Sequence, residues 1–204
     1  MSDSSEAGAG TSRAGAGSVL PEGGTARPIV RWGATVMHHK QEPIEVFDED
    51  LRVLVADMVA TMYAADGVGL AACQIGRDLA VFVFDCPDED GVRHQGVVCN
   101  PELYLPVGKD RELDDGDEGC LSLPGAFVPC ARPTYARVEG RGLDGSPISH
   151  AGNGLLARCL QHETDHCEGT VFGDRLSKRV RKRLFKEAEE AAAEYADGWP
   201  ADPG

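Results

Sequence analysis

Apolar residues recur at intervals of three and four along one early stretch of the chain, from Asp48 to Ala65. This spacing places them on one face of a helix. Asp48 is a suitable N-cap residue, and Asp66-Gly67 ends the pattern. The pattern therefore predicts a helix over residues 48–65, whose buried face is formed by Leu51, Val55, Met58, Val59 and Met62.

Two further helices are predicted in the C-terminal half. The first extends from Leu155 to Glu168, and Gly169 stands where a glycine commonly follows a helix. Its apolar positions indicate that this helix is central and buried. The second extends from about Asp174 to Tyr195.

Short strands are expected between these helices. An apolar run predicts a strand over residues 79–84, an acidic turn follows, and residues 95–99 form the returning strand. Residues 134–142 alternate between apolar and polar and predict another. The pattern favours an α+β fold, with small mixed or antiparallel sheets packed around the central helix and with an N-terminal and a C-terminal helix.

The two ends of the chain lack this patterning. Residues 1–26 are rich in glycine, alanine and serine, so we expect a disordered tail. Residues 27–196 then form one domain, and residues 197–204 a flexible C-terminal tail. At 204 residues with 42% apolar content, the chain can bury one core.

Composition and charge narrow the classes of protein. No run of eighteen apolar residues and no secretory signal are present, so we expect a cytoplasmic protein without membrane contact. A net charge of −14 argues against DNA binding. Seven cysteines without a repeated CxxC spacing suit a reducing compartment. The exception to the acidic balance is a basic stretch, formed by Lys178, Arg179, Arg181, Lys182, Arg183 and Lys186.

The segment His162-Glu163-Thr164-Asp165-His166 carries the candidate chemistry. Residues four apart share a helix face, so His162 and His166 can bind one metal ion. Glu163 lies beside them, near enough to transfer a proton. Two unpartnered histidines on a buried helix would be unfavourable, which makes metal binding the better interpretation than a solvated pair.

A catalytic metal site usually needs a third protein ligand. One candidate is Glu187, 21 residues after His166, which would indicate a zinc endopeptidase. It lies in a charged helix, where a solvated face is the simpler interpretation. The other candidate is Cys120, although a lone buried cysteine usually serves only packing. A metal-stabilised binding module without enzymatic activity is a more distant alternative.

Three segments together resemble the signature motifs of peptide deformylases. They are Gly67-Val68-Gly69-Leu70-Ala71-Ala72-Cys73-Gln74, Glu118-Gly119-Cys120-Leu121-Ser122 and Gln161-His162-Glu163-Thr164-Asp165-His166. Their order and spacing also match, and the resemblance extends from about Ile29 to the last helix. It implies a bacterial enzyme that removes the formyl group from N-formylmethionyl nascent peptides and releases formate.

The resemblance also implies roles for individual residues. Cys120, His162 and His166 would hold one divalent metal ion, Fe(II) in the native enzyme, with Zn(II), Ni(II) or Co(II) as substitutes. Glu163 would be the general base. The side-chain amide of Gln74 and the backbone N–H of Leu121 would stabilise the oxyanion. The substrate would be bound by the glycine-bearing segment and the methionine pocket, that is by Val68, Gly69, Leu155 and Cys159.

Other residues are interpreted from the same resemblance. Glu118 and Arg132 resemble a buried pair that would support the metal ligands. Cys167 and Arg158 depart from the usual residues: we expect Cys167 to pack as a small apolar side chain. Arg158 should lie at the edge of the cleft and bear on the peptide beyond methionine. The basic stretch could contact the ribosome, since some deformylases dock there through a C-terminal helix.

Overall fold

The computed structural model describes residues 20–195 and 197–200. Its α-helices are α1 (Glu49–Ala64), α2 (Gly154–Cys167), α3 (Phe172–Arg175) and α4 (Lys178–Ala191). The predicted helices over 48–65 and 155–168 are confirmed almost to the residue. Asp48 caps α1 as expected, because its side chain accepts a hydrogen bond from the Leu51 N–H at 3.1 Å.

The prediction of one continuous helix at the C-terminal end is wrong. Residues 174–195 are divided at Leu176, whose backbone is extended, and Ser177 begins a new helix. The Ser177 hydroxyl accepts a hydrogen bond from the Val180 N–H, which is the arrangement of an N-cap. The α-helix ends at Ala191, and a short 3-10 turn, Ala192–Glu194, follows it.

The main sheet has five strands, all antiparallel to their neighbours, in the order β1-β2-β3-β8-β9. They are β1 (Gly69–Ala71), β2 (Val81–Pro87), β3 (Arg93–Tyr104), β8 (Tyr135–Arg141) and β9 (Pro147–Asn153). Two small antiparallel pairs lie apart from this sheet: β4 (Leu113–Asp114) with β7 (Arg132–Pro133), and β5 (Asp117–Cys120) with β6 (Leu123–Pro129). The expected α+β class with small sheets is confirmed, although β9 and the two small pairs were not predicted.

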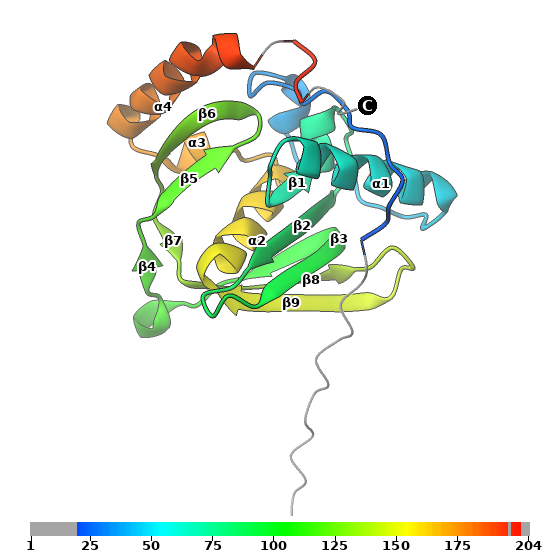
Figure 1. Ribbon diagram of the computed structural model, residues 1–204. Helices are drawn as coiled ribbons and strands as arrows, with labels where there is room; N and C mark the ends of the chain where they lie inside the picture. Colours follow the sequence, from blue (N-terminus) through cyan, green and yellow to red (C-terminus); the bar gives the residue numbers. More distant parts are fainter. Residues whose placement is uncertain (1–19, 196, 201–204) are drawn as a thin grey trace, which may run out of the picture.

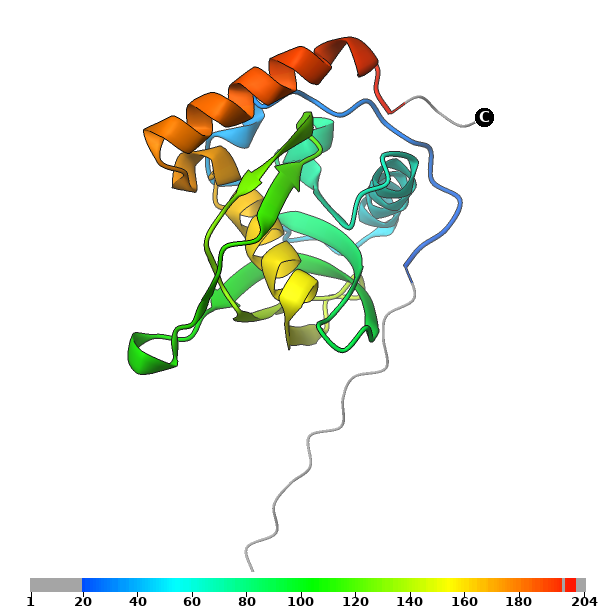
Figure 2. The ribbon, with the colours of Figure 1, turned by 60° about the vertical axis from the view of Figure 1, so that its left-hand side comes forward.

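The two faces of the main sheet are covered by different helices (Figures 1 and 2). Side chains alternate along a strand, so Phe82 and Phe84 point to one face and Val81 and Val83 to the other. The phenylalanines pack with α2, and the valines pack with α1. A third cluster joins the β5–β6 hairpin to α4 through Leu184. Residues 156–167 of α2 are all buried, so this helix lies in the interior of the domain.

Both described ends of the chain pack on the domain, which differs from the expected tails. Leu20 is buried, and the Thr25 N–H donates to the Asp57 carboxylate of α1 at 2.8 Å. At the other end, the Trp199 carbonyl accepts a hydrogen bond from the Ile29 N–H at 2.9 Å. Residues 20–26 and 197–200 therefore pack against the domain. Each end supplies an apolar side chain, Leu20 or Trp199, to the same cluster. Residues 1–19 and 201–204, in the two expected tails, lie outside the described residues.

None of the helices in the described ranges has the length and apolar character that crossing a membrane requires.

Candidate active site

Helix α2 holds three chemically active side chains in a buried setting. His162 and His166 lie one turn apart, with ring centroids 4.9 Å from each other, and Glu163 lies between them in sequence. Every residue of α2 from Leu156 to Cys167 is buried. The i, i+4 spacing seen in the sequence therefore does bring the two imidazoles together.

Strand β5 supplies the third group. It ends at Cys120, where the ladder with β6 is irregular between Gly119 and Cys120. The ligand atoms of Cys120, His162 and His166 all lie within 4.8 Å of one another. The Cys120 sulfur is 3.4 Å from Nε2 of His166. In the described part of the chain, no other group of three such side chains is this close.

The three side chains fit a divalent transition metal. A thiol and two imidazoles form a ligand set typical of Fe(II) and Zn(II) sites, and three protein ligands leave an open position for water. Nδ1 of His162 donates to Glu118 at 2.7 Å, which leaves Nε2 for a metal. Burial and the neighbouring His162 hold the pKa of His166 well below its ordinary value, so its imidazole is neutral, the form that binds metal.

Glu163 is a buried carboxylate beside this ligand set. One of its oxygens, Oε2, has no hydrogen-bond partner among the described residues. Burial raises the pKa of Glu163 to about 7, and the negative charge of Glu118 acts in the same direction, whereas His162 opposes it. A carboxylate with this pKa can both accept and return a proton near neutral pH.

Glu118 connects His162 to a buried charge network. Its Oε1 accepts from His162 at 2.7 Å and from Arg132 at 2.6 Å, and its Oε2 accepts from Arg132 at 3.0 Å and Arg158 at 2.9 Å. Burial alone would raise the pKa of Glu118, but these hydrogen bonds hold it well below its usual range. Arg132 also donates to Asp165 of α2 at 2.6 Å. The expected pairing of Glu118 with Arg132 is present, and it fixes the orientation of the His162 ring.

Arg158 lies in the pocket wall, but its donors are already engaged. Besides Glu118, its guanidinium donates to the Cys130 carbonyl and to the Asp114 carboxylate, each at 2.7 Å. Arg158 therefore has three structural partners, Glu118, Cys130 and Asp114, which the sequence did not indicate. Its expected contact with the peptide beyond methionine stays a prediction.

Gln74 and Leu121 lie beside the same sulfur. The Gln74 side chain is buried in a 3-10 turn, where its Oε1 accepts from the Ala71 N–H at 2.9 Å. Its Nε2 donates to the Cys120 sulfur at 3.6 Å. Leu121 follows Cys120 directly. Both line the pocket beside the ligand set, and their expected role in stabilising an oxyanion stays a prediction.

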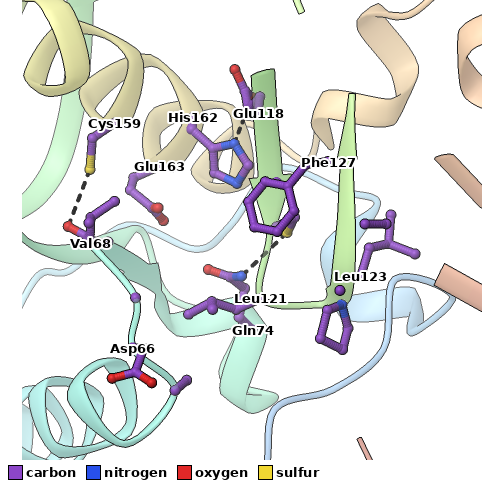
Figure 3. A pocket seen from close by; sticks show the side chains of 18 of the residues that line it. Asp66, Val68, Gln74, Glu118, Leu121, Leu123, Phe127, Cys159, His162 and Glu163 are labelled. Atoms are coloured by element: carbon purple, nitrogen blue, oxygen red, sulfur yellow. Dashed lines mark hydrogen bonds and ion pairs between the residues drawn. The ribbon is translucent and has the colours of Figure 1, made fainter. Parts of the chain in front are cut away.

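A pocket of about 520 Å³ opens onto these groups (Figure 3). The four residues expected to bind substrate all line it: Val68, Gly69, Leu155 and Cys159. So do Gln74, Cys120, Leu121, His162 and Glu163, whereas His166 lies behind them. Val68 and Leu155 are 39% and 41% exposed, so they form the rim, and Cys159 lies deeper.

The pocket also contains residues that the sequence did not reveal as candidates. Phe127 on β6 is 62% exposed at its mouth, and Asp66, Leu123, Tyr195 and Trp199 also line it. Phe127 follows an alternating pattern on β6 that could have marked an outward apolar residue. The two aromatic residues near the C-terminus carry no local signal of this kind.

Two other candidates lie away from the ligand set. Cys167, the last residue of α2, is buried in a core cluster, which agrees with a packing role. Glu187 lies on α4, where it pairs with Arg183 at 3.2 Å, and it does not belong to the group of close ligand atoms. The structure therefore gives the endopeptidase interpretation no third ligand.

Comparisons with known proteins agree with this geometry. The family model described as polypeptide deformylase matches residues 26–182. Peptide deformylase 1 of Streptomyces avermitilis is 53% identical over 175 residues, covering 85% of this chain and 81% of the relative. A peptide deformylase of Acidothermus cellulolyticus is 48% identical over 168 residues, covering 81% and 88%.

Solved structures of the same name share the fold. A Legionella pneumophila peptide deformylase aligns with a TM-score of 0.73 at 37% identity, covering 83% of this chain and 96% of that one. A Synechococcus elongatus peptide deformylase, solved in complex with actinonin, aligns with a TM-score of 0.70 at 33% identity, covering 81% and 88%. The chain therefore belongs to the peptide deformylase family, the metal-dependent hydrolases that remove the formyl group from the N-terminal methionine of nascent polypeptides and release formate.

Proposed function

We propose that Cys120, His162 and His166 hold the metal ion of this deformylase and that Glu163 is its general base. The observation that carries the proposal is the buried group of three ligand atoms within 4.8 Å of one another, with the Glu163 carboxylate beside it. We further propose Fe(II) as the native metal, with Zn(II), Ni(II) or Co(II) as substitutes. One soft thiolate and two imidazoles support this range of metals but do not distinguish among them.

When bound, the metal would polarise the formyl carbonyl and acidify the attacking water. Glu163 accepts the proton that the water loses as its oxygen attacks the formyl carbon. The N–H groups of Gln74 and Leu121 donate to the oxygen on which negative charge develops. Glu163 then returns the proton to the departing amine, the C–N bond breaks, and formate and a free methionine N-terminus are the products.

The pocket suits an extended peptide. Strand β1 is an edge strand of the main sheet, and β5 pairs only with β6 among the described strands. Both line the pocket, through Val68 and Gly69 on one side and residues 117–120 on the other. An extended peptide can therefore add as a strand between the two edges. Leu155 and Cys159 of α2 then receive the methionine side chain.

The decisive experiment measures metal content and formate release from formyl-Met peptides in the wild type and three variants. Cys120→Ala should lose most of the metal, because one of three ligands is removed. Glu163→Ala should keep the metal and lose about 100-fold or more in kcat, since a general base is removed. Glu187→Ala, on the same chain but outside the ligand group, is the control and should match the wild type. Full metal retention in Cys120→Ala would contradict the proposed ligand set.

We also propose that the enzyme works in the bacterial cytoplasm. All seven cysteines are unpaired and buried, which supports a reducing compartment. Burial raises the pKa of several of these thiols, for example that of Cys99 to about 12. Such thiols are unreactive packing groups rather than disulfide partners.

Finally, we propose that α4 contacts the ribosome. Six basic residues lie in this helix, and three of them, Lys178, Arg179 and Arg181, are among its first four residues, where the helix dipole disfavours positive charge. Arg181 and Arg183 pair with Asp174 and Glu187. Arg179 and Lys182 are exposed. The exposed side chains of Arg179 and Lys182 therefore support binding of this helix to an external anion such as ribosomal RNA.

A further inference from the structure

The C-terminal segment after α4 forms part of the substrate pocket. Tyr195 and Trp199 both line it, together with Leu121 and the start of strand β6 at Leu123–Gly125. Neither aromatic residue has a role in the mechanism described above. The inference that follows rests on the proposed function, and it concerns which peptides the pocket prefers.

Several contacts hold this segment in place. The Trp199 carbonyl accepts a hydrogen bond from Ile29, and Arg31 donates to the Tyr195 carbonyl. The two aromatic rings pack edge to face, with centroids 5.1 Å apart and planes at 89°. Trp199 also packs against the core cluster that Leu121 joins. The segment is thus a wall of the pocket that Ile29 and Arg31, far from it in the sequence, hold in place.

Gly125, near the start of strand β6, lets this wall approach. Gly125 has φ of +78°, and a Cβ there would lie 2.5 Å from Cβ of Ala191 and 3.0 Å from the Tyr195 ring. Any side chain at this position would push the Tyr195 ring away from the strand. The close approach places an aromatic surface beside the part of β6 that lines the pocket.

Strand geometry decides which substrate residue meets the wall. Successive side chains of an extended peptide point to opposite sides. With the methionine side chain against Leu155 and Cys159 of α2, the next side chain points the other way. Cys159 belongs to the core cluster on the α2 face of the sheet, whereas Leu121 and Trp199 belong to the cluster on the α1 face. Figure 3 likewise places Cys159 and Leu121 on different sides of Glu163.

We propose that Tyr195 and Trp199 bind the side chain of the second substrate residue and favour a large apolar one. The two rings and Leu121 offer it an apolar surface. A second-residue glycine has no side chain to place there. The preference for leucine over glycine at this position should therefore depend on the aromatic wall.

The test compares kcat/KM for formyl-Met-Leu-Ser and formyl-Met-Gly-Ser in metal-loaded, full-length enzyme. In Trp199→Ala, the ratio of kcat/KM for the leucine peptide over the glycine peptide should fall about tenfold, the size expected for a lost apolar contact. The change should be in KM for the leucine peptide, because the wall lies away from the reacting atoms. Trp199→Phe, which keeps an aromatic ring, should retain most of the preference.

Tyr135→Ala is the matched control, since it removes a half-exposed aromatic ring on β8 outside the pocket. A general loss of folding or metal in Trp199→Ala would lower both peptides equally and leave the ratio unchanged, and this result would overturn the proposal. Retention of the wild-type ratio at full activity would overturn it as well. A wild-type enzyme that released no formate from either peptide would instead contradict the proposed function itself.

Discussion

Gly69 shows how tightly the residues around Glu163 are packed. A Cβ at this position would lie 2.5 Å from Oε1 of Glu163 and 2.8 Å from the sulfur of Cys159. Both distances are shorter than a carbon atom tolerates. The Glu163 carboxylate can therefore occupy its position only because Gly69 has no side chain. The requirement for glycine here is one of space and not of backbone conformation.

Gly69→Ala should consequently impair the chemistry and spare the metal. The added methyl group displaces the Glu163 carboxylate, and a displacement of about 1 Å can lower kcat by about 100-fold. Steady-state formate release and metal analysis measure the two effects. Gly33→Ala is the control, because a Cβ at Gly33 would meet no atom within 4 Å. Wild-type kcat in Gly69→Ala would show that Glu163 tolerates the methyl group.

At the scale of the element, α4 combines two kinds of surface. Its Leu184 is buried against the β5–β6 hairpin, so one face of the helix packs in the core of the domain. Its basic residues occupy the first turns, and acidic residues such as Glu189, Glu190 and, after its end, Glu194 follow. The helix is thus positively charged at the end where it begins, although the whole chain carries a net charge of −14.

Charge reversal tests whether this end of α4 contacts the ribosome. The double variant Arg179→Glu/Lys182→Glu should pellet with ribosomes several-fold less than the wild type, and added salt should weaken wild-type pelleting. The matched control is Lys109→Glu/Arg111→Glu, which reverses one lysine and one arginine in an exposed turn elsewhere. Equal pelleting of both double variants would rule out the contact. Deformylation of short peptides should be similar in all three proteins.

At the scale of the whole molecule, Asp85 joins three elements. This buried carboxylate on β2 accepts hydrogen bonds from Tyr63 of α1 at 2.5 Å and from Arg93 of β3, whose Nε lies at 2.5 Å. The Arg93 and Tyr63 hydrogen bonds hold the pKa of Asp85 below its ordinary value, although burial opposes them. Because the folded-state pKa is lowered, Asp85 stabilises the fold above its unfolded pKa of about 3.9.

Asp85→Asn should therefore lower the free energy of unfolding in a pH-dependent way. At pH 7 the loss should be about 1–3 kcal/mol, the range for hydrogen bonds to a charged group. The difference from the wild type should shrink as pH falls through the folded-state pKa, since the wild-type carboxylate then becomes neutral too. Urea unfolding at a series of pH values measures it, with the exposed Asp115→Asn as control. A difference that is constant with pH would contradict the electrostatic account.

Local order in this protein could be predicted from the sequence alone. The boundaries of α1 and α2, the Asp48 cap and the shared face of His162 and His166 follow from the 3.6-residue period of a helix, which acts between neighbours in the chain. The short strands β4, β5, β6 and β7 were not predicted, because these segments of two to seven residues carry too little alternation of apolar and polar residues. The break at Ser177 was also missed, since a single side-chain hydrogen bond determines it.

The choice of a third residue for the proposed metal site depended on both the sequence and the tertiary structure. Periodicity left Cys120 and Glu187 both open, and only the resemblance of three motifs to one family favoured the cysteine. Tertiary structure brought Cys120 to the histidines, gave Glu118 its partners His162, Arg132 and Arg158, and placed Trp199 in the pocket. These contacts join residues far apart in sequence, and they depend on how a hairpin, a helix and the two chain ends pack. That is why local pattern determined the helix with the histidines, whereas packing alone decided the shape of the pocket in front of it.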